Sequence, residues 1–132
     1  MIKSLGLLLL RLCIGIFLVH HGFDKLHNIE GFAKTYVIPM HLPFPIFLSH
    51  VAAYSEIIGS YLLLPGILTR LGALAIFGTI SVAVYHAISN VGLNLYALEL
   101  LGLYWGGAVC IVLNGPGKFS LDYLILKLKT EG

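Results

Sequence analysis

The sequence predicts an all-α protein: a four-helix bundle that spans a membrane and ends in an amphipathic helix at the membrane surface. Of its 132 residues, 58% are hydrophobic and only 11% are charged, whereas a soluble domain carries about 25% charged residues. Four apolar runs are each long enough to cross a hydrocarbon core of about 30 Å as a helix: 5–22, 47–66, 71–88 and 93–113. Little chain remains outside these runs, so we expect a single domain over 1–132.

The first run contains Arg11, which interrupts the apolar stretch where a signal peptide would be continuous. This run is therefore expected to stay in the protein as a span. The connection behind it has helical spacing over 28–37 and is expected to lie along the membrane surface. It then reaches the proline-rich sequence IPMHLPFPIF, which cannot be the interior of a helix.

The remaining boundaries follow from turn residues. The pair Pro65–Gly66 ends the second span, and the glycine-containing segment 90–94 separates the third from the fourth. The sequence Gly-Pro-Gly at 115–117 ends the fourth span. A tail helix over 120–129 then begins at Ser120, a favourable N-cap, and has one apolar stripe with lysines beside it. Such a helix is typical of an interfacial segment on an anionic leaflet.

Four spans put both termini on the same side of the membrane. That side holds most of the lysines and arginines outside and near the span ends, and positive charge favours the cytoplasm. We therefore expect cytoplasmic N and C termini. The formal net charge of +2 is too small to indicate binding to nucleic acid.

Four charged side chains, Arg11, Glu56, Arg70 and Glu99, lie in or at the ends of the apolar runs. A charge in hydrocarbon costs about 2.5 kcal/mol or more, so it tends to face the interior of a bundle and to mark a functional site. Helical geometry places Glu56 and Glu99 on faces rich in small residues, which let membrane helices approach closely.

Depth along the spans adds two histidines to this set. His21 and His86 fall near the extracytoplasmic ends of their spans, in the same half of the bundle as both glutamates. We expect a polar cavity that opens outwards and is lined by His21, Glu56, His86 and Glu99. Arg11 and Arg70 would close its inner end and offset the charge of the acids.

Three chemistries fit such a cavity. Buried carboxylates with histidines relay protons to or from a quinone, because burial raises carboxyl pKa values and histidine titrates near neutrality. The same groups could instead bind a metal or haem. Neither is predicted, because the adjacent His20 and His21 are expected to face different ways on their helix. A structural role for the glutamates, fixing helix register, is the remaining alternative. Two roles are open for Lys25: an anchor for lipid headgroups, or a cationic contact for an anionic substrate.

Three segments resemble the DoxX family. They are RLCIGIFLVHHGFDKL at 11–26, EIIGSYLLLPGILTRLGAL at 56–74 and GPGKFSLD at 115–122. The resemblance includes Arg11, His21, Lys25, Glu56 and Arg70. Glu99 falls where the family often carries a glutamate on its fourth span.

The resemblance implies a four-helix protein of the inner (cytoplasmic) membrane, grouped with small subunits of quinone-linked oxidoreductases. It implies quinone as the cofactor, a partner redox subunit and a homo-oligomer as candidate partners, and leaves open whether the chain is itself an enzyme. A non-enzymatic assembly factor or chaperone is the second reading, and a small-solute or proton conduit is the third.

Overall fold

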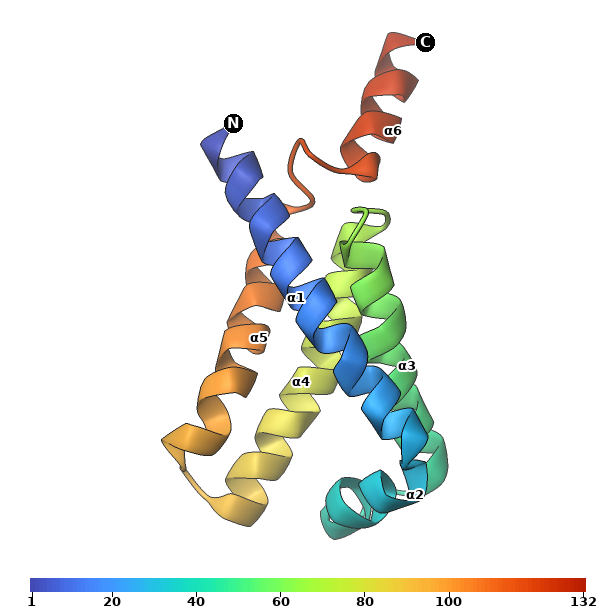
Figure 1. Cartoon of the computed structure of the whole chain (residues 1–132), viewed down its shortest axis with the longest axis vertical. Helices are drawn as coiled ribbons and strands as arrows, with labels where there is room; N and C mark the ends of the chain where they lie inside the picture. Colours follow the sequence, from blue (N-terminus) through green and yellow to red (C-terminus); the bar gives the residue numbers. More distant parts are fainter.

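The computed structural model describes all 132 residues as an all-helical chain without strands. Figure 1 shows its elements, which are, in order, α1 (Ile2–His27), α2 (Ile29–Phe32), η1 (Ala33–Val37), η2 (Ile38–Met40), α3 (Pro45–Leu63), α4 (Thr69–Val91), α5 (Leu95–Asn114) and α6 (Leu121–Glu131). Four of them, α1, α3, α4 and α5, are long and apolar enough to cross a membrane. The predicted fold class is confirmed.

The observed helices do not end where the apolar runs end. The first span was predicted over 5–22, but α1 continues to His27. The second was predicted to 66, but α3 ends at Leu63. Hydropathy marks the part of a helix that suits hydrocarbon, whereas backbone hydrogen bonding continues through the polar residues that follow in α1. The helix α3 ends early because Pro65 and Gly66, which has a positive φ of 75°, break it inside the apolar run. The extra turn of α1 carries Asp24 and Lys25 into the site described below.

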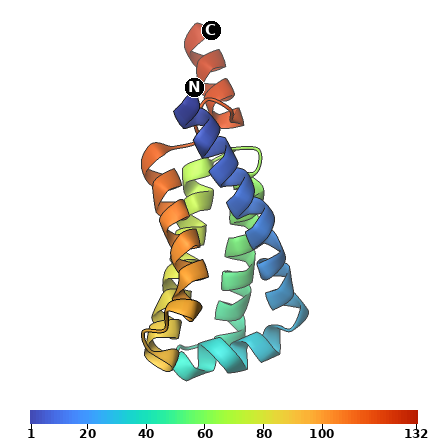
Figure 2. The same cartoon turned by 60° about the vertical axis from the view of Figure 1, so that its left-hand side comes forward.

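The four long helices pack in the spatial order α1, α3, α4, α5. We call the end with both termini and α6 the terminal end, and the end with α2, η1, η2 and the 92–94 turn the loop end. Figures 1 and 2 show that α1 and α5 diverge towards the loop end. They contact each other around Gly107, where an added Cβ would lie 2.6 Å from Ile14 Cδ1. The bundle is therefore closed in its terminal half and open in its loop half.

Small residues let α3 approach its two neighbours. A Cβ on Gly59 would lie 2.9 Å from the carbonyl oxygen of Gly72 on α4, and one on Gly22 of α1 would lie 2.6 Å from Ile57 Cγ1 on α3. The predicted small-residue contact face of Glu56 is confirmed for α3. The corresponding prediction is wrong for α5, because a Cβ on Gly102 or Gly106 would meet nothing within 4 Å.

Arg11 ties the terminal end together. Its guanidinium is fully buried, donates to the carbonyl oxygen of Leu63 at 3.1 Å, and donates also to that of Phe119. Burying a charged group is costly unless it is hydrogen-bonded. These bonds join α1 to the end of α3 and to the segment that leads into α6.

Asp122, near the start of α6, binds the first turn of α4. Its carboxylate accepts hydrogen bonds from the Leu68 and Thr69 amides, at 2.8 and 2.9 Å, and from the Thr69 hydroxyl at 2.7 Å. Burial opposes ionisation of this carboxyl, but these hydrogen bonds and the nearby Arg11 outweigh burial and lower the pKa of Asp122. A side chain from α6 thus caps α4.

The tail forms a separate helix after the Gly-Pro-Gly break, as predicted. Ser120 caps it by accepting from the Tyr123 amide at 3.2 Å. In Figures 1 and 2, α6 projects beyond the terminal end of the bundle. Its apolar side chains are exposed, and its placement along a membrane surface stays a prediction.

Candidate functional site: a cavity at the loop end

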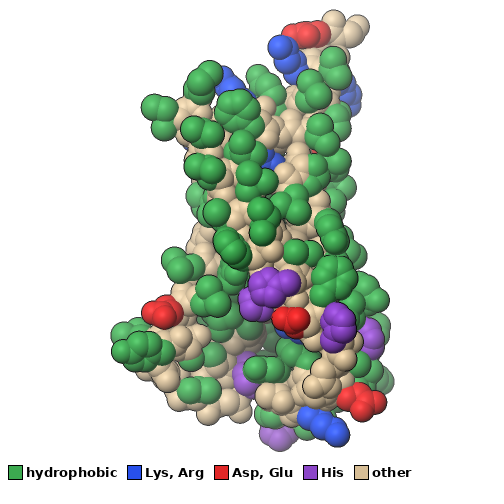
Figure 3. Space-filling model, in the orientation of Figure 1, with side chains coloured by type: hydrophobic (Ala, Val, Ile, Leu, Met, Phe, Trp, Pro, Cys, Tyr) green, Lys and Arg blue, Asp and Glu red, His purple; other side chains and the backbone are tan.

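A cavity of about 1050 Å³ occupies the space between the diverging helices at the loop end. Twenty of its 31 lining residues are hydrophobic, so it is an apolar chamber with a few polar groups. Those groups include His21, Asp24, Lys25, Glu56, His86 and Tyr104. Figure 3 shows apolar side chains over the middle of this face, with histidines and charged side chains gathered around a hollow near the loop end.

Glu56 and Lys25 form an ion pair at this cavity. Glu56, on α3, is 2% exposed, and the Lys25 side chain, on α1, is 19% exposed. The Lys25 ammonium donates to Glu56 Oε1 and lies 5.2 Å from the centroid of the Phe32 ring. The second carboxylate oxygen, Oε2, is buried without a hydrogen-bond partner. The pair therefore keeps one free acceptor in an apolar setting.

His86, on α4, is the second polar group with a free position. Its Nε2 is buried without a hydrogen-bond partner. Its ring lies edge-on to Tyr36 of η1, with centroids 5.0 Å apart. A buried polar atom without a partner is costly, so a free nitrogen at a cavity is a candidate ligand contact.

His21 lies on the α1 side of the cavity. Its ring is edge-on to Tyr104 of α5, with centroids 6.4 Å apart. Of the four residues predicted to line the cavity, the structure thus brings three together: His21, Glu56 and His86.

Glu99 does not join them, and this prediction is wrong. Glu99 is exposed on α5 and is absent from the cavity lining. Its helical face was identified correctly, since Glu99 shares it with Gly102 and Gly106. However, α5 turns that face outwards. A small-residue pattern identifies a face suited to close contact without identifying which neighbour it meets.

The two arginines do not offset the charge of Glu56. Arg11 lies at the terminal end, bonded to backbone carbonyls. Arg70 is exposed, and its guanidinium lies beside Gly115 at the same end. The counter-charge is Lys25, for which the sequence left two roles open.

Sequence reasoning also missed three groups at the loop end. Asp24 was assigned no role, and Phe32 and Tyr36 were assigned only to the helical spacing over 28–37 at the membrane surface. One signal was present: Asp24 and Lys25 follow His21 by three and four residues, which places all three on one side of a helix. No comparable sequence signal predicts that η1 packs over α4, because that contact depends on the path of the loop.

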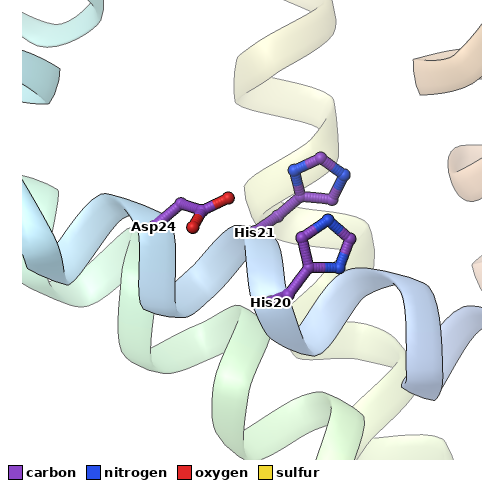
Figure 4. A group of neighbouring side chains, drawn as sticks. All are labelled: His20, His21 and Asp24. Atoms are coloured by element: carbon purple, nitrogen blue, oxygen red, sulfur yellow. The ribbon is translucent and has the colours of Figure 1, made fainter.

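His20, His21 and Asp24 form a cluster on the last turns of α1. The two imidazole centroids are 4.3 Å apart, and one ligand atom from each of the three residues lies within 4.8 Å of the others. Figure 4 shows both rings together, with the Asp24 carboxylate alongside. The expectation that the two histidines face different ways is wrong, because their rings lie beside each other.

Comparison with known proteins agrees with this architecture. The family model DoxX matches residues 6–88. An uncharacterized protein of Haemophilus influenzae is 35% identical over 96% of this chain and 87% of its own length. The Bacillus subtilis protein named "Putative oxidoreductase CatD" is 30% identical over 98% of this chain and 93% of its own.

The Escherichia coli protein named "Inner membrane protein YqjF" is 27% identical over 96% of both chains. No solved structure matches this chain. The family match covers more than half of the chain, and the relatives match it almost end to end. This chain is a multi-pass membrane protein that belongs to the DoxX family.

Proposed function

We propose that this protein is an inner-membrane subunit of a quinone-linked oxidoreductase, and that the loop-end cavity receives the quinone headgroup. The observation that carries the proposal is the pair of unsatisfied buried atoms, Glu56 Oε2 and His86 Nε2, at one largely apolar cavity. A ligand that fits must be mostly apolar and must offer a few polar atoms.

A quinone has that chemistry. Its ring and isoprenoid tail suit an apolar lining, and its two carbonyl oxygens accept hydrogen bonds. The cavity volume, about 1050 Å³, lies just above the range of about 300–1,000 Å³ for small-molecule sites. The gap between α1 and α5 would leave room for the tail to continue into lipid.

Each polar residue has a separate role in this proposal. Lys25 and His86 donate hydrogen bonds to the quinone carbonyl oxygens, and Glu56 exchanges a proton through its free oxygen. Reduction of a quinone to a quinol takes up two electrons and two protons. The electrons come from a partner redox subunit, and His21, at the cavity wall, connects Glu56 with the aqueous side. Arg11 and Arg70 are left out, because they lie at the other end of the bundle.

The name of one relative agrees with the proposal. CatD of Bacillus subtilis is named for an oxidoreductase activity and aligns with nearly the whole of this chain. That name supports a redox role for this chain. The residues proposed to perform it are inferred from the cavity lining and not from the name.

A binding measurement with matched variants tests the proposal. The protein is reconstituted in lipid nanodiscs, and binding of a short-chain quinone is measured for the wild type, Glu56→Gln and His86→Phe. Each variant should bind the quinone about tenfold more weakly. His86→Phe removes a donor to one carbonyl oxygen, and Glu56→Gln removes the carboxylate that holds the Lys25 ammonium in place to donate to the other. A hydrogen bond to a charged group contributes about 1.5–3 kcal/mol. Glu99→Gln is the control, since it alters an acid of another span that lies outside the cavity.

Two results would contradict the proposal. One is quinone binding that is equally affected by Glu56→Gln and Glu99→Gln. The other is a wild-type protein that binds no quinone but co-purifies with a client protein, which would favour the assembly-factor reading.

A further inference from the structure

We propose that His20, His21 and Asp24 form a binding site for a divalent transition-metal ion at the loop end of α1. The ion is of the kind that prefers imidazole nitrogen together with carboxylate oxygen, such as Zn²⁺ or Cu²⁺. The proposal does not depend on quinone binding, because it concerns a separate set of ligand atoms at the edge of the cavity.

The geometry of the cluster suits a metal ion. The ligand atoms of the three residues lie within 4.8 Å of one another. Metal–nitrogen distances of about 2.0–2.1 Å in a zinc site require neighbouring ligand atoms to be somewhat closer than this. Small side-chain rotations close the difference, and no backbone movement is needed because all three residues lie on one rigid helix (Figure 4).

These three side chains also have no hydrogen-bond or ion-pair partner outside the cluster. The histidine rings that form hydrogen bonds are those of His27 and His50, each with a backbone carbonyl oxygen of its own helix. The ion pairs are Lys25–Glu56 and Lys127–Glu131. The imidazoles of His20 and His21 and the carboxylate of Asp24 thus converge without any bond that would explain their convergence.

The charge of the cluster also suits a cation. Lys25 lies next to Asp24 in sequence and would repel a cation, but Glu56 neutralises it. The Asp24 carboxylate is then left as the net negative charge of the cluster. Two neutral imidazoles and one carboxylate reduce the charge of a divalent ion and leave its remaining positions for water or a ligand.

The position of the site makes it reachable by an ion. α1 has 26 residues and is about 39 Å long, which exceeds a hydrocarbon core of about 30 Å. His20 and Asp24 are exposed, and His21 and Asp24 line the cavity mouth. An ion held there would lie in the last turns of α1, beside the cavity.

Copper binding by the tag-free protein in nanodiscs tests the site. Cu²⁺ is the probe, at concentrations set by a competing chelator, and pulsed electron paramagnetic resonance counts the coordinated imidazoles. The expected result is one Cu²⁺ per chain with two imidazole ligands. His20→Ala and His21→Ala should each lower the affinity by about 100-fold or more, because even an outer-shell partner contributes about 10–100-fold.

Matched variants separate the site from general histidine binding. His41→Ala and His50→Ala remove histidines elsewhere in the chain and should leave Cu²⁺ affinity unchanged. Asp24→Asn keeps the shape of the side chain while removing its charge, so it should weaken Cu²⁺ binding without altering the circular dichroism spectrum.

The proposal is overturned if His20→Ala and His21→Ala bind Cu²⁺ as tightly as the wild type. It is overturned also if the bound ion shows one imidazole or none. Since no step of this measurement uses quinone, its outcome is independent of the quinone-binding experiment.

Discussion

At the residue scale, Lys25 and Glu56 stand out because they place two charges in an apolar part of the protein. A buried ion pair is weak evidence for stability, since desolvation costs offset its attraction and apolar replacements often stabilise as well. Glu56 also retains a buried oxygen without a partner. A pair that adds little stability and stays incompletely satisfied is better explained by ligand binding than by folding.

Single and double replacements test that interpretation. Lys25→Met leaves Glu56 buried without its counter-charge and should destabilise the protein by about 3–5 kcal/mol. The double variant Lys25→Met/Glu56→Leu removes both charges and should recover most of the lost stability. Neither variant should regain the quinone affinity of the wild type. Unfolding in mixed detergent micelles measures the stabilities. A double variant as unstable as Lys25→Met would show that the pair is needed for the fold.

For some residues the sequence was sufficient to predict burial. Glu56 and Arg11 were predicted to face the interior because a charge in an apolar span is costly in lipid, and both are buried. The same argument failed for Glu99, which is exposed one turn into α5. Near a helix end a carboxylate can reach the interface, so the energetic argument weakens there.

At the element scale, glycines set how closely α3 approaches α4. Gly59→Val would push a side chain against the Gly72 carbonyl oxygen and Ile76, and should destabilise the protein by about 1–3 kcal/mol. Gly102→Val on α5 is the matched control, because nothing lies within 4 Å of the added Cβ. Its effect should stay within about 0.5 kcal/mol. Equal losses in the two variants, measured by the same unfolding assay, would contradict this packing.

The attachment of α6 to α4 should depend on pH through Asp122. The pKa of this carboxyl lies below its ordinary value of 3.8, so the folded state favours the ionised form. Its contribution is present in full well above pH 3.8 and is lost as the pH falls through the lower folded-state pKa.

Asp122→Asn measures that contribution. Removing the cap should cost about 0.5–2 kcal/mol near neutral pH, and the difference from the wild type should shrink as the solution is acidified below pH 3.8. Thermal unfolding across a pH series gives the comparison. A difference that stays constant down to pH 2, or that grows on acidification, would exclude the ionised Asp122 as the cap.

The helices themselves were largely predictable from the sequence. Which helices pack against one another was not. Apolar runs predicted four spans, and turn residues predicted the breaks at Pro65–Gly66 and at 115–117, because these features depend on local chemistry. The outward turn of α5 depends instead on which helices meet at the terminal end. The same holds for the contact of Tyr36 with His86, since it requires the proline-rich loop to fold back over α4.

At the scale of the whole molecule, the bundle is closed at one end and open at the other. Arg11 and Asp122 join three helices and the tail at the terminal end. At the loop end, α1 diverges from α5 (Figure 2). The cavity there has polar groups from all four spans. Packing is thus concentrated in one half of the molecule, and ligand-binding chemistry in the other. The cytoplasmic location of the termini stays a prediction from the distribution of lysine and arginine.

Photocrosslinking with a quinone tests the central claim most directly. A photoreactive quinone is added to the protein in native-like membranes, and the labelled residues are identified by mass spectrometry. The account predicts labels on the cavity wall, at Tyr36, Tyr104 or the last turns of α1, that excess unlabelled quinone suppresses and that Glu56→Gln reduces but Glu99→Gln does not. Labels spread over the lipid-facing surfaces of all four spans, without competition by unlabelled quinone, would contradict it.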